Sequence, residues 1–251
     1  YLILHAYKKK LDLESLYTLE KKNHEQEQEL NQERLRFYTN ITHELRTPLT
    51  LILGPLEDMQ KETSLPAKQA QKLSVIHQSA LRLLNLINQI LEFRKTETQN
   101  KKLCVSKGNI APLIHEIGLK YKELNQKTKI DFQIQIEKEE MLLFFDKEII
   151  TIVLDNLISN AIKYTEQGRV TLSLYQTIRN EVAYTEIKVS DTGYGISAEA
   201  LPHIFDRYYQ ESGKHQASGT GIGLALVKNL VTLHEGEIRA ESIQNEGSTF
   251  Y

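Results

Sequence analysis

Residues 37–50 read FYTNITHELRTPLT, and this stretch decides the first part of the fold. Apolar residues recur mostly every four positions from here onward, which predicts one apolar stripe along a helix. The members of the stripe are Phe37, Ile41, Leu45, Ile52, Leu56 and Met59. His43 lies about 200° around the helix from Ile41 and from Leu45, so we expect it to face away from the stripe.

The residues around His43 favour chemistry over packing. Glu44 is its immediate neighbour, and Thr47 follows one turn later on the same exposed face. Pro48 lacks an N–H and its ring crowds the Glu44 carbonyl, so we expect the helix to bend just past the histidine. A lone histidine on a helix is nevertheless most often a solvated surface residue. A catalytic interpretation therefore needs support from the rest of the chain.

Composition limits the classes of function. The 251 residues carry a formal net charge of −2, which offers no electrostatic case for direct binding of nucleic acid. The single cysteine excludes an internal disulfide or a cysteine-rich zinc site and is compatible with a reducing compartment. The apolar residues 1–7, YLILHAY, are followed by three lysines. This pattern is typical of the cytoplasmic end of a membrane helix, with a frayed terminus as the alternative.

The pattern divides the chain before residue 104 into two zones, a charged and glutamine-rich one followed by one with hydrophobic helical spacing. Residues 1–36 are expected to form a membrane-proximal helical linker or weak coiled coil, and residues 37–100 a hairpin of helices 37–60 and 67–99. The second helix carries a repeat of 3.5 residues formed by Leu73, Ile76, Ala80, Leu83, Ile87 and Ile90. Leu84 and Leu91 widen its apolar face. One hairpin has too little core, so we expect two chains to pair into a four-helix bundle.

Residues 104–251 change to an α/β pattern. We expect helices at 110–125 (capped by Asn109), 146–164 and 221–234 (ending at a Gly236 cap). Alternating residues predict strands at 130–136, 168–177 and 182–190, with a more buried strand at 141–145. Residues 192–219 read as a long functional loop, and strands near 237–243 and 248–251 close the sheet.

Two glycine clusters mark candidate binding loops in this half. Asp191 follows a strand and could accept a hydrogen bond from an adenine amino group, while Gly193 and Gly195 allow a close approach of the backbone. A second cluster, GTGIGL at 219–224, opens a helix whose free amides suit phosphate groups. This cluster does not follow a strand in a βαβ unit, which argues against a dinucleotide site.

An asparagine pair on the preceding helix adds a candidate metal ligand. Asn156 and Asn160 are four residues apart and therefore share a face. The side-chain oxygen of asparagine is a hard ligand that suits Mg²⁺ with bound phosphates. Taken alone, such a pair is more often a solvated face or a cap.

Five motifs in this order resemble those of one family, the sensor histidine kinases of two-component systems. FYTNITHELRTPLT resembles the phosphoacceptor box, and DNLISNAIKYT (155–165) resembles the asparagine box. DTGYGI (191–196), IFDRYYQ (204–210) and GTGIGLALVKNLVTLHEGEI (219–238) resemble the first glycine, phenylalanine and second glycine boxes. The resemblance covers about residues 37–251. It implies an all-α dimeric four-helix bundle, with one helical hairpin per chain, followed by an α/β two-layer sandwich of the GHKL ATPase type.

The resemblance also implies an activity, with ATP and Mg²⁺ as cofactors. His43 would be autophosphorylated and would pass the phosphoryl group to an aspartate of a response-regulator receiver, and phosphatase activity is open to such a core. Glu44 would orient the imidazole or take its proton. In relatives with this acceptor box, Thr47 is associated with dephosphorylation of the response regulator. The bland alternative is that the Thr47 hydroxyl only bonds back to the His43 carbonyl.

The same resemblance assigns the nucleotide site. Asn160 would hold Mg²⁺ with Asn156 nearby, and Asp191 would read adenine. The remaining residues assigned to the nucleotide are Lys163, Tyr164, Gly193, Gly195, Gly219, Gly221, Gly223 and Leu224. Many relatives have an arginine where this chain has Gln210. Arg207 and Lys214 are therefore both candidates for the cation near the γ-phosphate.

The wording of the acceptor box further resembles hybrid glycan-sensing regulators, in which the receiver lies on the same polypeptide. The expected partners are a second copy of the chain and a receiver domain. The expected location is the cytoplasmic side of a bacterial inner membrane, with the anchor in an upstream helix. Two alternatives remain, a GHKL-type ATPase and a degenerate kinase that acts as a dimeric scaffold. The pair His43-Glu44 ahead of the asparagine box disfavours the first, because GHKL ATPases at large lack an upstream histidine hairpin.

Overall fold

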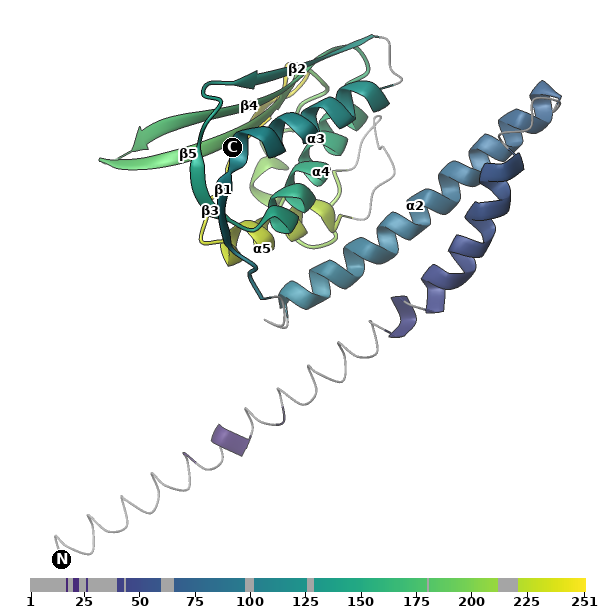
Figure 1. Cartoon of the computed structure of the whole chain (residues 1–251), viewed down its shortest axis with the longest axis horizontal. Helices are drawn as coiled ribbons and strands as arrows, with labels where there is room; N and C mark the ends of the chain where they lie inside the picture. The colour runs from purple at the N-terminus through teal and green to yellow at the C-terminus, as the bar shows by residue number, and fades with distance from the viewer. Residues whose placement is uncertain are drawn as a thin grey trace, which may run out of the picture. The chain divides into compact units, whose positions relative to one another are not determined.

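The computed structural model describes residues 17, 20–22, 26, 40–42, 44–59, 66–97, 102–125, 129–179, 181–211 and 221–251. His43, Lys214, Gly219 and most of the expected linker 1–36 lie outside these residues. The chain divides into two compact units, Tyr1–Thr98 and Gln99–Tyr251. Figure 1 shows a helical hairpin in the first unit and an α/β sandwich in the second.

The first unit is an antiparallel helical hairpin. Residues 44–59 are helical through Pro48, and they pack against α2 (Ala67–Glu97). The buried contact consists of Leu49 and Leu53 from the first helix and Ala80 and Ile87 from α2, with Leu84 beside them. Among the described residues, no helix is both long and apolar enough to cross a membrane.

Two polar contacts between the helices match one register of the hairpin. Arg46 donates through Nη2 to Asn88 Oδ1 at 2.7 Å, near one end. Near the other end, His77 Nε2 lies 3.6 Å from Glu57 Oε1. Both pairs join the first helix to α2 in the same antiparallel alignment.

The single apolar stripe expected on the first helix is wrong. Leu49 and Leu53, which were left out of it, face α2, while a second row of apolar residues remains 36–50% exposed. This row, which we call the open stripe, consists of Leu45, Ile52, Met59, Ile76, Leu83 and Ile90. Residues at heptad spacing split in this way because a helix in a bundle must face two neighbours, and one hairpin supplies only one of them.

The second unit is a two-layer α/β sandwich, as predicted. Its sheet has the strand order β2-β4-β5-β7-β6, in which β2 and β4 are parallel and the other neighbours antiparallel. The strands are β2 (Ile130–Ile136), β4 (Gly168–Arg179), β5 (Val182–Asp191), β6 (Ala240–Ile243) and β7 (Gly247–Phe250). Three helices cover one face of the sheet (Figure 1). They are α3 (Ile110–Leu124), α4 (Lys147–Tyr164) and α5 (Gly223–Leu233).

Alternation in the strands and the 3.6-residue period in the helices build the core between these layers. Val170, Leu172 and Leu174 point from β4 to the helical side and are 0–1% exposed. Ile158 of α4 and Leu230 of α5 are fully buried opposite the sheet. Burial of side chains of this size contributes about 1.5–3 kcal/mol each.

The expected cap of α3 is confirmed. The Asn109 side chain accepts a hydrogen bond from the backbone N–H of Ala111. At the start of α4, the buried carboxylate of Asp146 accepts from the N–H groups of Glu148 and Ile149. The cap at the end of α5 differs from the prediction, because Glu235 (φ 59°) and not Gly236 adopts the left-handed conformation.

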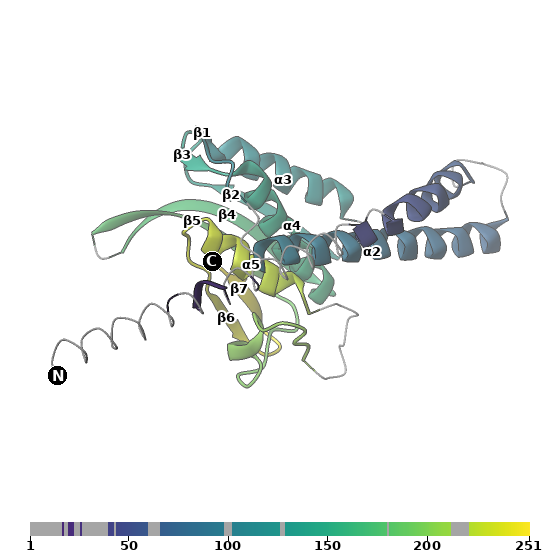
Figure 2. The ribbon, with the colours of Figure 1, turned by 90° about the horizontal axis from the view of Figure 1, so that it is seen from below.

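Two strand predictions also need correction. β3 (Leu142–Phe145) pairs with β1 (Ser106–Asn109), which was not predicted, in a separate two-stranded ribbon. Leu142 and Phe144 are therefore exposed, although this strand was expected to be the more buried one. The β4–β5 hairpin is longer than expected and projects past its neighbours (Figure 2), because β2 pairs with β4 only as far as Leu174.

Candidate functional site

Helix α4 carries the candidate nucleotide residues along its length. Asn156, in the middle, is buried and donates through Nδ2 to the carbonyl of Ile152 at 2.8 Å. Asn160 follows one turn later and is half-buried. Near the end of the helix, Lys163 Nζ donates to the Tyr164 hydroxyl at 3.1 Å and lies 4.6 Å from the centre of its ring. Amide, ammonium and phenol groups thus follow one another along one helix.

Asp191 ends β5, where its carboxylate is mostly withdrawn from water. One oxygen, Oδ1, accepts from the N–H of Gly193 at 2.9 Å. Burial raises the pKa of the Asp191 carboxyl, although hydrogen bonds from the backbone N–H groups of Gly193 and Ser248 oppose the rise. An ionised carboxylate in such a place has unused acceptor capacity, which suits an amino group of a ligand.

The glycine loop that begins at Asp191, residues 191–196, contacts the end of α4, and we call it the Asp191 loop. The N–H of Tyr194 donates to the carbonyl of Tyr164 at 3.2 Å. A Cβ on Gly193 would lie 2.3 Å from that carbonyl oxygen, so no larger residue fits. Gly195 has φ 64°, and a Cβ there would lie 2.1 Å from the carbonyl oxygen of Ile243. Both glycines of DTGYGI are therefore required by the close approach of neighbouring backbone.

The start of α5 contacts the middle of α4. A Cβ on Gly223, the first residue of α5, would lie 2.9 Å from Asn156 Oδ1. Leu224 beside it is half-buried. Gly221 has φ 69°, and its carbonyl accepts from the N–H of Tyr208 at 2.9 Å. Helix α4 is thus shared by the Asp191 loop at its end and by the α5 amides at its middle, with Asn160 between them in sequence.

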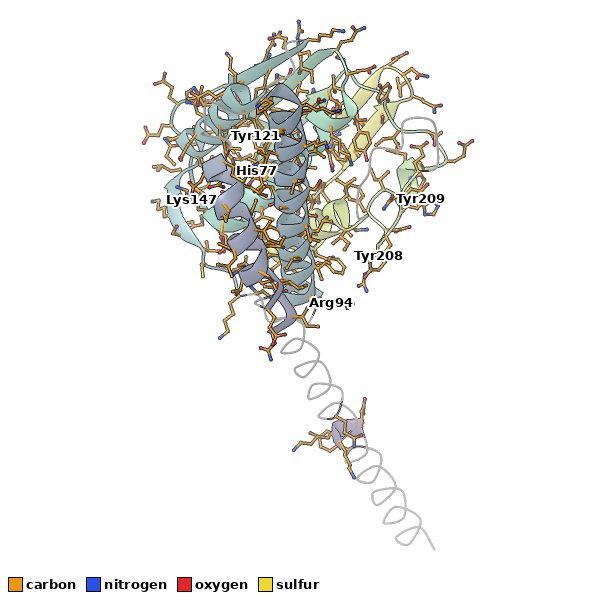
Figure 3. The ribbon with its side chains drawn as sticks, turned by 90° about the vertical axis from the view of Figure 1, so that its right-hand side faces the viewer. His77, Arg94, Tyr121, Lys147, Tyr208 and Tyr209 are labelled. Carbon is orange, nitrogen blue, oxygen red and sulfur yellow. The ribbon has the colours of Figure 1, made fainter. Side chains whose placement is uncertain are left out.

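Tyr208 belongs to the IFDRYYQ segment and lies at the surface (Figure 3), with 61% of the residue exposed. It adopts φ 61°, which is rare for a bulky residue. Gln210 and Arg207 of the same segment are also exposed. Of the two candidate cations for the place of the arginine of relatives, Arg207 is described, and Lys214 lies outside the described residues.

A magnesium ion at this site would have to take most of its ligands from a bound nucleotide and from water. Among the residues that the structure describes, no group of three His, Cys, Asp or Glu side chains could hold a metal. Asn160 offers a single neutral oxygen. Mg²⁺ keeps waters and takes phosphate oxygens as ligands, so one protein ligand beside a phosphate site is compatible with its chemistry.

The phosphoacceptor segment is described only on either side of His43. Glu44 and Thr47 are both exposed on the first helix of the hairpin. Arg46 turns toward α2, where it meets Asn88 as given above. The orientation expected for His43 itself lies outside the described residues.

Several residues at the site were missed by sequence reasoning. Thr165 is fully buried after α4, and its Oγ1 and Asp191 Oδ1 would both lie 2.9 Å from a Cβ on Gly193. The Tyr194 hydroxyl donates to Glu166 Oε2 at 3.0 Å, which raises the Tyr194 pKa. The available signal was that polar residues stand at the last position of the asparagine box, Thr165, and directly after it, Glu166.

Comparison with known proteins agrees with this geometry. Residues 33–99 match the family model of the His Kinase A (phospho-acceptor) domain. Residues 145–251 match the model of the histidine kinase-, DNA gyrase B- and HSP90-like ATPase. The chain belongs to the sensor histidine kinases of two-component signalling and holds their kinase core, a helical hairpin followed by a GHKL-type ATP-binding sandwich.

Individual relatives point the same way. The chain is 36% identical over 249 residues to "Histidine kinase P4" of Formosa agariphila, and the alignment covers 97% of this chain and 18% of that protein. It is 33% identical over 248 residues to "Autoinducer 2 sensor kinase/phosphatase LuxQ" of Vibrio vulnificus, over 96% of this chain and 29% of that protein. The fold resembles the crystal structure of full-length ShkA in complex with AMPPNP, with a TM-score of 0.67 and 25% identity over 85% of this chain and 44% of that one.

The chain spans only part of its relatives. It covers between 16% and 37% of the length of curated relatives such as these. The stimulus, the partners and the further steps of signalling in the whole protein are therefore matters of proposal.

Proposed function

We propose that this chain transfers the γ-phosphoryl group of ATP to His43 and then to an aspartate of a receiver domain. The observation that carries the proposal is the half-buried Asp191 carboxylate, which ends a strand and accepts a hydrogen bond from the N–H of a glycine loop. This loop is hydrogen-bonded to the end of α4, the helix that also carries Asn156 and Asn160. The arrangement would provide an adenine acceptor, a metal ligand and phosphate-binding amides on connected elements.

The roles of individual residues follow from their chemistry. Asp191 would accept from the adenine amino group, and Lys163 and Tyr164 would contact the nucleotide. Gly219, Gly221 and Gly223 precede or begin α5, and the free amides at this helix N-terminus would bind the phosphate groups of the nucleotide. Leu224 would contact the nucleotide beside them. Asn160 would hold Mg²⁺, which supplies neutralisation of the phosphate charge when it is bound.

In the hairpin, Glu44 would keep the His43 imidazole neutral and nucleophilic, or take its proton. Thr47, exposed one turn beyond His43 in sequence, would act in the reverse direction, on the phosphorylated receiver. The Vibrio relative is named a sensor kinase/phosphatase, which supports a core that works in both directions.

The open stripe supports a homodimer. Leu45, Ile52 and Met59 recur at heptad spacing, and so do Ile76, Leu83 and Ile90 on α2. On both helices the stripe lies on the same rotational side of the hairpin contact, and in an antiparallel pair this places the two rows on one side of the hairpin. The register brings Leu45 level with Ile90, Ile52 with Leu83, and Met59 with Ile76. A second hairpin would bury all three layers.

Location at the cytoplasmic face of a bacterial membrane is also a proposal, supported by the lysines that follow the apolar residues 1–7. The activity is tested by incubating the chain with γ-labelled ATP and Mg²⁺ and then exposing it to acid. Label that is lost in acid and kept in alkali indicates phosphohistidine. ATP hydrolysis without labelled protein would favour a GHKL-type ATPase, and ATP binding with neither would favour a scaffold.

A further inference from the structure

The hydroxyl of Ser242, on the edge strand β6, contacts the end of the Asp191 loop. It accepts a hydrogen bond from the backbone N–H of Ile196 at 2.8 Å. It donates to the carbonyl of Gly247 at 2.8 Å and lies 3.0 Å from Ser248 Oγ. Ser242 therefore connects the last residue of DTGYGI to two residues of the β6–β7 hairpin.

The bonding capacity of this hydroxyl is fully used. A serine hydroxyl has one hydrogen and two lone pairs. Its hydrogen goes to the Gly247 carbonyl, and one lone pair receives the Ile196 N–H. The Ser248 hydroxyl must then be the donor to the other lone pair. Such a saturated group fixes the positions of all three of its partners.

The same hairpin contacts the loop at three further points. The N–H of Asn245 donates to the carbonyl of Tyr194 at 2.7 Å. Gly195 lies against the backbone of Ile243, where there is no space for a Cβ. In addition, the N–H of Ser248 donates to the Asp191 carboxylate. The β6–β7 hairpin thus contacts the loop at both of its ends.

We propose that Ser242 is a positioning residue that holds the Asp191 loop in its nucleotide-binding conformation before the nucleotide arrives. The inference rests on the proposed function, in which Asp191 and this loop bind adenine. In this proposal Ser242 itself contacts neither the nucleotide nor His43. A loop that is ordered in advance loses less conformational entropy on binding, so the effect of Ser242 should fall on affinity and not on the chemical step.

The test compares Ser242→Ala with Thr249→Val in the whole chain. Thr249 is the matched control, because its hydroxyl lies 3.1 Å from Ser190 Oγ across neighbouring strands of the same sheet. Both variants remove a hydroxyl-to-hydroxyl contact, but only Ser242 bonds to the loop. Calorimetric titration with ATP and Mg²⁺ gives Kd, and initial rates of autophosphorylation give KM and kcat.

For Ser242→Ala we expect Kd and KM to rise about fivefold to tenfold, the size of one or two lost neutral hydrogen bonds, with kcat unchanged. Hydrogen exchange without nucleotide should accelerate at the Ile196 amide and not along β4. Thr249→Val should change none of these. Overall loss of structure would instead lower kcat and accelerate exchange across the sheet.

Two results would overturn the assignment of Ser242. One is an ATP affinity of Ser242→Ala within twofold of the unmodified chain, and the other is an equal loss in Thr249→Val. A failure of the proposed function is recognised separately on the unmodified chain, which would then either bind no ATP or bind it without acquiring acid-labile label.

Discussion

Truncation of Leu83 in the open stripe should weaken the dimer of hairpins. Leu83 is 48% exposed in a single chain and lies at the level of Ile52, in the middle layer of the stripe. If the second hairpin covers these layers, Leu83→Ala removes apolar contact from both subunits at once. The variant leaves the core of its own hairpin intact, since Leu49, Leu53, Ala80 and Ile87 are unchanged.

The magnitude follows from the exposed fraction. Full burial of a leucine side chain contributes about 1.5–3 kcal/mol, so burial of the remaining half contributes about 1 kcal/mol per subunit, or about 2 kcal/mol per dimer. The cavity left by truncation raises the loss to about 2–4 kcal/mol. The dimer Kd should therefore rise by a factor of about 30 to nearly 1,000.

Leu51 provides the matched control. It is 71% exposed, more than Leu83, but it is rotated about 100° from Ile52 and lies off the stripe. Sedimentation of fluorescently labelled chain over a dilution series measures Kd, and circular dichroism checks that the helices persist. If Leu83→Ala leaves Kd unchanged, or if Leu51→Ala weakens the dimer equally, the open stripe is not the dimer interface.

Three further predictions concern the nucleotide and the acceptor. Asp191→Asn should weaken ATP binding by about 1–3 kcal/mol in titration at neutral pH. Burial raises the pKa of the Asp191 carboxyl, so its contribution to folding stability is present at low pH and is lost as pH rises through its folded-state pKa. At neutral pH the ligand-free Asp191→Asn variant should therefore melt no lower than the parent chain. A lower melting temperature would contradict this. Asn160→Ala should remove the Mg²⁺-dependent part of ATP affinity and leave binding in a chelator within about twofold; equal losses in both conditions would place the metal elsewhere. Thr47→Ala should keep most autophosphorylation yet slow the loss of phosphate from a receiver, whereas Glu44→Ala should reduce autophosphorylation strongly. Parallel losses in both variants would mean that the two residues act only through helix geometry.

The sandwich was predictable because local patterns coincide with burial there. Alternating residues in the first part of β4 are covered by helices, with Val170, Leu172 and Leu174 only 0–1% exposed, so their period of two is strong in the sequence. The caps at Asn109 and Asp146 are local hydrogen bonds, and their residue types indicate them. The strand β1 was missed because SKGN has no apolar alternation, and its pairing with β3 is a long-range contact.

The hairpin shows where pattern alone fails. Heptad residues facing α2 and heptad residues facing outward are chemically alike, so the sequence could not assign Leu45 and Leu49 to different faces. The candidate site could likewise be predicted only in part. Asp191 and the glycines stand in a recognisable motif, whereas Ser242 acts through a neighbouring hairpin more than 40 residues further along the chain. No local rule connects a serine on an edge strand with a loop so distant in sequence.

Phosphorylation at His43 is the most direct test of the central claim. The parent chain and His43→Gln are incubated with γ-labelled ATP and Mg²⁺, and ATP binding is titrated in parallel. The account predicts acid-labile label on the parent, none on the variant, and equal ATP affinity for both. Substantial acid-labile label on His43→Gln would contradict it, because another residue would then be the phosphate acceptor.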